Sequence, residues 1–187
     1  MELTAFTNLS LDGVFQAPGR VDEDTRGEFA HGGWAAPYQA MYETGDLNAE
    51  VELLFGRWTF EQFHHSWSGD DPFSQFFRAT RKHVVTRQKN YRTDWANSTV
   101  LEGEAAASVA KCKAEASKPL LMFGSGILAS ELMAHGLIDR YVLLIHPLFL
   151  GSGRPFAAGL PAPHKLTLQE VRSTKKGVLI ATYTREN

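Results

Sequence analysis

The chain has 187 residues, of which 43% are hydrophobic and 21% charged, a composition typical of a globular domain with its own core. Nineteen basic and twenty-one acidic residues leave a formal charge of −2, so no positive field favours nucleic acid or acidic lipid as a partner. The single cysteine, Cys112, excludes an internal disulfide and is typical of a reducing compartment. We expect one domain spanning residues 1–187.

Short apolar runs alternate with helical patterns along the chain. The expected strands are Leu3–Asn8, Val51–Phe55, His83–Thr86, Leu120–Phe123, Tyr141–His146, Lys165–Val171 and Val178–Thr184. Apolar residues that recur every three or four positions predict helices at Glu102–Ala116 and Ile127–His135. Strands that alternate with helices favour an α/β fold in which helices cover both faces of a largely parallel sheet.

The last two expected strands differ from the others. Only RSTKKG separates them, which leaves no room for a crossover helix, so they should form an antiparallel hairpin. The predicted fold is therefore a three-layer αβα domain with a mixed, mainly parallel central sheet and an antiparallel C-terminal hairpin. The segment Leu11–Gly33 lacks periodicity. Loops of this length in compact domains are usually functional or disordered, and we expect this one to border the active site.

A glycine-rich turn joins an apolar strand to a helix at FGSGIL (Phe123–Leu128). Glycines let a backbone approach a phosphate, and the helix N-terminus supplies unpaired N–H groups. Gly124, Gly126 and Ala129 satisfy the dinucleotide pattern G-x-G-x-x-A, but no acid follows about 20 residues later, which argues against a conventional NAD-binding Rossmann domain. A tight structural turn explains the glycines equally well.

Two further junctions each place a hydroxyl near an arginine. In LFGRWTFEQF (Leu54–Phe63), Gly56 ends the strand and Arg57 lies at its carboxyl end, where ligands bind in open α/β sheets. Thr59 is expected to cap the following helix. HVVTR (His83–Arg87) ends in a threonine and an arginine. Each pair could be a cap beside a solvated charge, but the planar fork of arginine also suits a 2′-phosphate.

These motifs, in this order, resemble the dihydrofolate reductase family. FGRWTFEQF resembles its G-R-x-T-x-E segment, HVVTR its second phosphate-binding strand, and FGSGIL its G-G-G turn. NLSLDGVFQAPG and LIDRYVLLIHPLFLGSGRPF resemble more closely the C-terminal reductase domain of bacterial riboflavin biosynthesis and its stand-alone relatives. The resemblance covers essentially the whole chain. It implies an oxidoreductase that uses NADPH and forms a homodimer.

The resemblance also implies which residues hold the cofactor. Arg57, with Thr86 and Arg87, would face the 2′-phosphate of NADPH, and the loop Leu11–Gly33 would close over the nicotinamide. The complete set implied to bind NADPH is Gly56, Arg57, Trp58, Thr59, Thr86, Arg87, Gly124, Ser125, Gly126, Ile127 and Leu128.

The part of the chain that is expected to bind the substrate differs from the folate reductases at one position. Those enzymes carry an acid on the first helix, five residues after a Trp, whereas here Gln39 follows Trp34 at that spacing. An amide cannot supply the carboxylate that holds a pterin, so we do not expect dihydrofolate as substrate. Glu43, one helical turn on, could substitute from a different angle. Arg154 could hold an anionic substrate, and Asp12, in the SLDG turn, is the candidate proton donor.

Other kinds of site are not supported by the sequence. Adjacent His64 and His65 would point about 100° apart on a helix, and no histidine pair has the i, i+4 spacing of a helical zinc site, so no metal is expected. A G-x-S-x-G hydrolase elbow around Ser125 would need a glycine at position 123, where the chain has Phe123. Glu2 lies where a secretory signal would carry basic charge, and the longest apolar stretch is too short to cross a bilayer, so we expect a soluble, cytoplasmic protein.

The sequence therefore predicts an NADPH-dependent reductase. Its substrate is expected to be a small heterocyclic or carbonyl-type compound that is pterin- or ribosylaminopyrimidine-like. The alternative is a non-catalytic nucleotide- or metabolite-binding protein that retains the fold.

Overall fold

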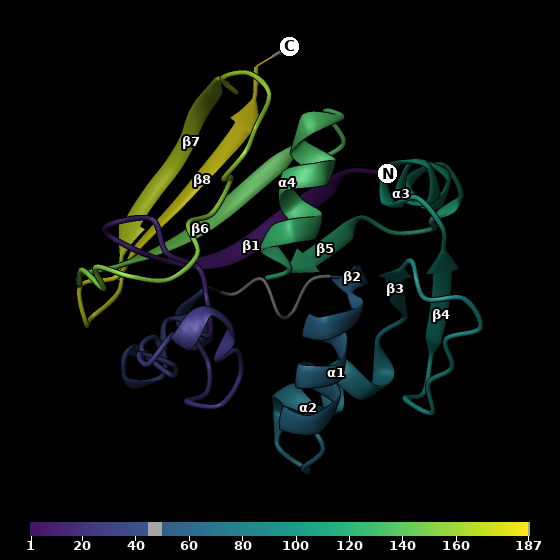
Figure 1. Cartoon of the computed structure of the whole chain (residues 1–187), viewed down its shortest axis with the longest axis horizontal. Helices are drawn as coiled ribbons and strands as arrows, with labels where there is room; N and C mark the ends of the chain where they lie inside the picture. Colours follow the sequence, from purple (N-terminus) through teal and green to yellow (C-terminus); the bar gives the residue numbers. More distant parts are fainter. Residues whose placement is uncertain (45–49, 187) are drawn as a thin grey trace.

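The computed structural model describes residues 1–44 and 50–186, and within these ranges one mixed sheet runs in the order β4-β3-β2-β5-β1-β6-β8-β7 (Figure 1). The strands are β1 (Leu3–Ser10), β2 (Glu52–Gly56), β3 (Lys82–Thr86), β4 (Ser98–Glu102), β5 (Leu120–Phe123), β6 (Arg140–His146), β7 (Leu166–Ser173) and β8 (Leu179–Arg185). The helices are α1 (Arg57–Ser66), α2 (Pro72–Ala79), α3 (Ala105–Glu115) and α4 (Gly126–Ala134), with 3-10 turns at Arg26–Glu28, Ala36–Tyr38 and Ala40–Glu43. No helix in the described ranges has the length and apolar character needed to span a membrane.

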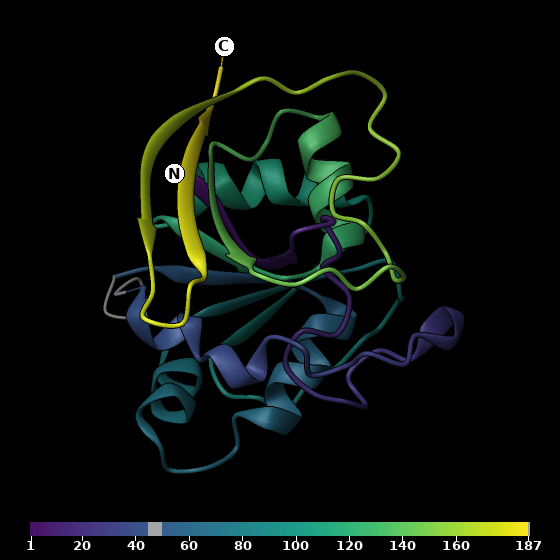
Figure 2. The same cartoon turned by 90° about the vertical axis from the view of Figure 1, so that its left-hand side faces the viewer.

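Side chains of the central strands alternate between two apolar layers, which explains why these strands are apolar throughout. Leu54 and Met122 pack with residues of α3 and α4 on one face. Their neighbours Leu53 and Phe123 pack with residues of α1 and α2 on the other. Successive strand residues point to opposite faces, so each strand contributes to both layers. Figure 2 shows α3 and α4 on one side of the sheet and α1 and α2 on the other. The predicted three-layer αβα fold is confirmed.

Strand direction also agrees with the sequence prediction. The pairs β1–β5, β1–β6, β2–β5, β2–β3 and β3–β4 are parallel. In contrast, β8 is antiparallel to both β6 and β7. The mainly parallel sheet and the antiparallel C-terminal hairpin are therefore both confirmed.

One strand was not predicted. The helix expected at Glu102–Ala116 begins at Ala105, and Glu102 instead ends β4. As an edge strand beside β3, β4 leaves its side chains half-buried or exposed. Without a fully covered face, its sequence STVLE carries no continuous apolar run that would identify it.

A buried ion pair joins the amino-terminal ends of β2 and β3. The Oε2 atom of Glu52 lies 2.6 Å from Nε2 of His83, and both side chains are buried. The Oε1 atom of Glu52 accepts hydrogen bonds from the backbone N–H and the hydroxyl of Ser117, at 3.2 and 2.8 Å. Burial acts to raise the pKa of Glu52, but the hydrogen bonds from His83 and Ser117 outweigh it and lower this pKa.

Glu52→Ala is expected to reduce the free energy of unfolding by about 3–5 kcal/mol, because His83 loses its partner inside the protein. Urea unfolding at neutral pH measures the change. Glu50→Ala is the control, since its exposed carboxylate lies 3.8 Å from Lys118. The lowered folded-state pKa means that the stabilisation by Glu52 is present above its unfolded pKa and is lost as pH falls through the folded value. Equal effects of the two substitutions would contradict this role.

Candidate cofactor and substrate site

A cavity of about 280 Å³ opens at the carboxyl ends of four neighbouring parallel strands. Its lining includes Asn8 of β1, Gly56 of β2, Thr86 of β3 and Phe123 of β5. Helices α1 and α4 start at the same edge, directly after β2 and shortly after β5. This is the edge at which open α/β sheets bind their ligands.

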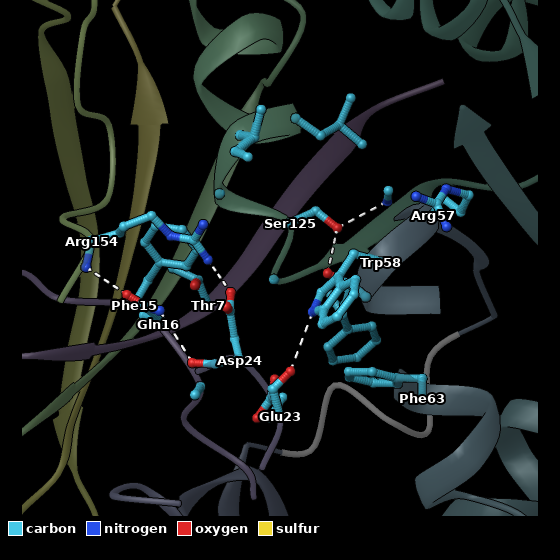
Figure 3. Close-up of a pocket in the computed structure, with 18 of the residues that line it drawn as sticks. Thr7, Phe15, Gln16, Glu23, Asp24, Arg57, Trp58, Phe63, Ser125 and Arg154 are labelled. Atoms are coloured by element: carbon cyan, nitrogen blue, oxygen red, sulfur yellow. Dashed lines mark hydrogen bonds and ion pairs between the residues drawn. The ribbon is translucent and has the colours of Figure 1, made fainter. Parts of the chain in front are cut away.

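The two helices begin without side-chain caps, and one serine joins their starts. Gly56 is the N-cap residue of α1 and Ser125 that of α4. The Ser125 hydroxyl accepts a hydrogen bond from the Gly56 N–H and donates one to Oγ1 of Thr59, both at 2.9 Å (Figure 3). The first N–H groups of both helices therefore remain open to an anion. The prediction that Thr59 caps α1 is wrong, because the helix starts earlier, at Arg57.

Both glycines of the FGSGIL turn have a local reason to be glycine. Gly124 has a φ of 53°, in the left-handed region that favours this residue. A Cβ on Gly126 would lie 2.1 Å from the ring of Phe15, which packs on the start of α4. The turn thus brings bare backbone to the cavity wall.

The residues that the family resemblance assigned to the cofactor all line this one cavity. They are Gly56, Arg57, Trp58, Thr59, Thr86, Arg87, Gly124, Ser125, Gly126, Ile127 and Leu128. The two arginines have carboxylate partners: Arg57 lies 3.0 Å from Glu61, and Arg87 lies 3.1 Å from Glu131 and 3.4 Å from Glu104. The arginine side chains are 40% and 65% exposed, and exposed ion pairs contribute little, so a phosphate can replace these partners.

The long loop after β1 forms another wall of the cavity, which confirms that Leu11–Gly33 borders the site. Its lining residues, which the sequence did not single out, are Phe15, Gln16, Ala17, Pro18, Glu23, Asp24 and Arg26. The Gln16 amide N–H₂ donates to the carbonyls of Asp24 and Arg26, at 3.1 and 2.9 Å. Its amide oxygen accepts the backbone N–H of Arg154 at 3.0 Å. A loop without periodicity gave no sequence signal for these contacts.

A buried carboxylate holds this loop against the segment that carries Arg154. Asp24 accepts hydrogen bonds from Nε and Nη2 of Arg26, at 2.8 and 2.7 Å, and pairs with Nη2 of Arg154 (Figure 3). Burial acts to raise the pKa of Asp24, but the two arginines outweigh it and lower this pKa. Arg154 lines the cavity, as expected, although its guanidinium is engaged by the loop.

The surroundings of Asp12 argue against its predicted role as proton donor. Its carboxylate accepts hydrogen bonds from the Ser10 hydroxyl at 2.5 Å and from the backbone N–H groups of Leu150 and Gly151, at 3.2 and 2.8 Å. The hydrogen bonds from Ser10 and Gly151 lower the pKa of Asp12 to about 2, so it is ionised near neutral pH. Asp12 does not line the cavity and instead holds the turn at residues 150–151.

The predicted substrate residues Gln39 and Glu43 do not line this cavity. Two 3-10 turns replace the expected first helix, the earlier one containing Pro37, and Gln39 lies between them at a φ of 54° with an exposed side chain. Glu43 faces the β7–β8 turn, where its carboxylate accepts the Lys175 N–H at 3.3 Å. The helical spacing that would have aimed both residues inward does not apply, and Met41 lines the cavity instead.

Comparison with known proteins agrees with this geometry. The sequence profile of the RibD C-terminal domain matches residues 2–180. The chain belongs to this family. The uncharacterized protein YyaP of Bacillus subtilis (strain 168) is 25% identical over 185 residues, which cover 94% of this chain and 90% of that protein.

Solved structures confirm the dihydrofolate reductase-like fold of this RibD C-terminal domain. A putative riboflavin biosynthesis protein from Shewanella sp. PV-4 superposes with a TM-score of 0.70 at 19% identity, covering 100% of both chains. Dihydrofolate reductase from Enterococcus faecalis, complexed with NADP(H) and RAB-propyl, superposes with a TM-score of 0.62 at 14% identity, covering 100% of this chain and 97% of that one.

Asp24→Asn is expected to loosen the loop at residues 11–33, because a neutral amide cannot pair with two guanidinium groups as a carboxylate does. Hydrogen exchange of this loop should become faster. Asp22→Asn is the matched control, since Asp22 is 75% exposed in its pair with Arg20. The lowered pKa of Asp24 means that the wild-type loop should loosen in the same way as pH falls through that value. Unchanged exchange in Asp24→Asn would contradict this account.

Proposed function

We propose that this protein is an NADPH-dependent reductase acting on a small heterocyclic or carbonyl-type substrate, pterin- or ribosylaminopyrimidine-like. The observation that carries the proposal is the convergence of two uncapped helix N-termini and two arginines on one cavity. Free N–H groups suit a pyrophosphate, and arginine suits a 2′-phosphate. Membership of the RibD C-terminal domain family supports the same class of reaction.

The residues present fit a dinucleotide. The starts of α1 and α4 would hold the pyrophosphate, since both helices begin without side-chain caps and Gly124 brings backbone without a side chain to the wall. Arg57 and Arg87 would bind the 2′-phosphate. When bound, the reduced dinucleotide supplies the hydride, and the protein orients both reactants and excludes water.

The remaining wall suits a planar ring. The side chains of Phe6, Phe63, Phe123 and Met41 supply apolar surface against which an aromatic heterocycle could pack. Among the described residues 34–44, only Met41 lines this wall, so no carboxylate from that segment is available for a pterin. We therefore propose a substrate other than dihydrofolate.

The proposed function is tested by titrating the protein with NADPH and following its oxidation with a panel of reducible compounds. The panel contains a dihydropterin, a ribosylaminouracil, a cyclic imine and an α-diketone. We expect NADPH to bind more tightly than NADH and at least one compound to oxidise it. Binding without any oxidation would instead favour the alternative, a non-catalytic nucleotide-binding protein.

Arg57→Ala is expected to weaken NADPH binding about ten- to a hundred-fold and to leave NADH nearly unchanged, because only NADPH carries the 2′-phosphate. Glu131→Gln is the matched variant, with the opposite expected effect on NADPH binding. It removes the nearer of the two carboxylates paired with Arg87, leaves Glu104, and should strengthen NADPH binding. Calorimetric titration with both dinucleotides measures the effects, and equal losses of NADPH and NADH in Arg57→Ala would defeat the assignment.

We also propose that the protein forms a homodimer, as the family resemblance implied through residues 137–153. Within that segment β6 lies between β1 and β8; its Tyr141, Val142 and Leu144 side chains are buried within one chain, whereas Leu143 and Ile145 are half-buried. Phe149, three residues after the end of β6, is 76% exposed and is the better candidate for a contact.

Light scattering is expected to give a mass twice the 20.8 kDa of one chain, and Phe149→Asp should shift this mass toward that of the monomer. Val21→Asp, at a 74% exposed position, is the control, and a monomeric wild type would refute the proposal.

A further inference from the structure

Reduction of a C=N or C=O bond consumes a proton as well as a hydride, and Asp12 cannot supply it. Three described residues with carboxyl groups line the cavity, namely Glu23, Asp24 and Glu131. A proton donor must hold a proton on its carboxyl group and face the ligand.

Two of the three are held by arginines. Asp24 is engaged by Arg26 and Arg154, which lower its pKa. Both carboxylate oxygens of Glu131 lie within reach of Nη2 of Arg87, at 3.3 and 3.1 Å. The lowered pKa keeps Asp24 ionised near neutral pH, and the Glu131 carboxylate is occupied by its pair with Arg87.

Glu23 differs from them in its partners. Its Oε2 atom accepts the backbone N–H groups of Gly19 and Arg20, at 2.7 and 3.2 Å. No partner of its Oε1 atom occurs among the residues at 1–44 and 50–186. The guanidinium of Arg20 is directed to Asp22 and Ser66, at 2.9 and 2.8 Å, rather than to this carboxyl group. One oxygen is thus fixed in the loop and the other is left for the cavity.

The surroundings of Glu23 favour its neutral form. The half-buried Glu23 side chain lines the same cavity as Trp58 and Phe63, and the Trp58 indole N–H donates to its backbone carbonyl at 3.3 Å (Figure 3). Burial raises the pKa of Glu23 and outweighs the two backbone hydrogen bonds. The raised pKa agrees with the geometry, because within residues 1–44 and 50–186 the carboxyl group is hydrogen-bonded only by backbone N–H groups and by no arginine or lysine side chain.

We infer that Glu23 donates the proton that accompanies reduction in this cavity, an inference that rests on the proposed reductase function. The carbon of the C=N or C=O bond would receive a hydride, with its two electrons, which the reduced nicotinamide dinucleotide of the proposed function would supply. The O–H bond at Oε1 of Glu23 breaks, and an N–H or O–H bond forms on the substrate heteroatom. Water then returns a proton to the carboxylate, so the charges balance over one turnover.

Several charged groups set the pH at which Glu23 titrates. Asp24 is next to it in the chain and acts to raise its pKa, whereas Arg20 acts to lower it. The other charged side chains that line the cavity are Arg26, Arg57, Arg87, Glu131 and Arg154. The reaction needs the protonated acid, so the rate should fall as pH rises through the pKa of Glu23.

Glu23→Gln tests the inference, because the amide oxygen can still accept the Gly19 and Arg20 N–H groups while the transferable proton is lost. Glu28→Gln is the matched control, an exposed glutamate of the same loop that does not line the cavity. The first measurement is the ¹³C NMR titration of the side-chain carboxyl groups, in which the Glu23 resonance is the one missing from Glu23→Gln. Its midpoint is expected above the usual value of about 4.3.

The second measurement is single-turnover NADPH oxidation with the compound that the wild type reduces best. Glu23→Gln should lose about a hundred-fold or more in rate and lose the fall in rate at high pH, with NADPH affinity unchanged. Glu28→Gln should behave as the wild type.

The proposed reductase function and the proposed role of Glu23 would be overturned by different results. If the wild type oxidises no NADPH with any compound of the panel, the reductase function fails and the proton donor with it. If the wild type turns over but Glu23→Gln keeps its rate and pH profile, or if the Glu23 carboxyl titrates at or below about 4.3, only the assignment of Glu23 is overturned.

Discussion

The site depends on a single hydroxyl that joins two parts of the chain 69 residues apart. Ser125, held at a φ of 56° before α4, binds the Gly56 N–H and the Thr59 hydroxyl at the start of α1. Because this hydroxyl is used between the two junctions, it caps neither helix, and both N-termini face the same space. Two local strand-to-helix turns thereby become one anion-binding edge.

The charges in the cavity are arranged in pairs of unequal strength. The side chains of Arg57 and Arg87 are exposed and pair with half-buried glutamates, and a ligand phosphate can compete with these partners at little cost. Arg154 and Arg26 share the buried Asp24, a contact that is costly to break because it would leave a charge without a partner. The first pair of arginines is therefore suited to ligand exchange, and the second to holding the loop in place.

The loop after β1 combines these two tasks. Through Gln16 and Asp24 it is tied to the segment of Arg154, and through Phe15 it packs on the bare backbone of Gly126. The same ties place Glu23 beside Trp58 at the cavity wall. A loop with no helix or strand of its own is thus ordered by contacts to three other parts of the chain.

The sequence by itself determined the central strands, the C-terminal hairpin, the glycine-rich turn and the cofactor motifs, because apolar periodicity and turn chemistry act within a few neighbouring residues. Only the tertiary structure decided the remaining features. Asp24 meets Arg154 across 130 residues, and the direction of Gln39 depends on 3-10 turns that break helical spacing. The edge strand β4 had no apolar run because it lacks a covered face. Contacts of this kind are set by strand register and packing over the whole sheet, which no local pattern of residues contains.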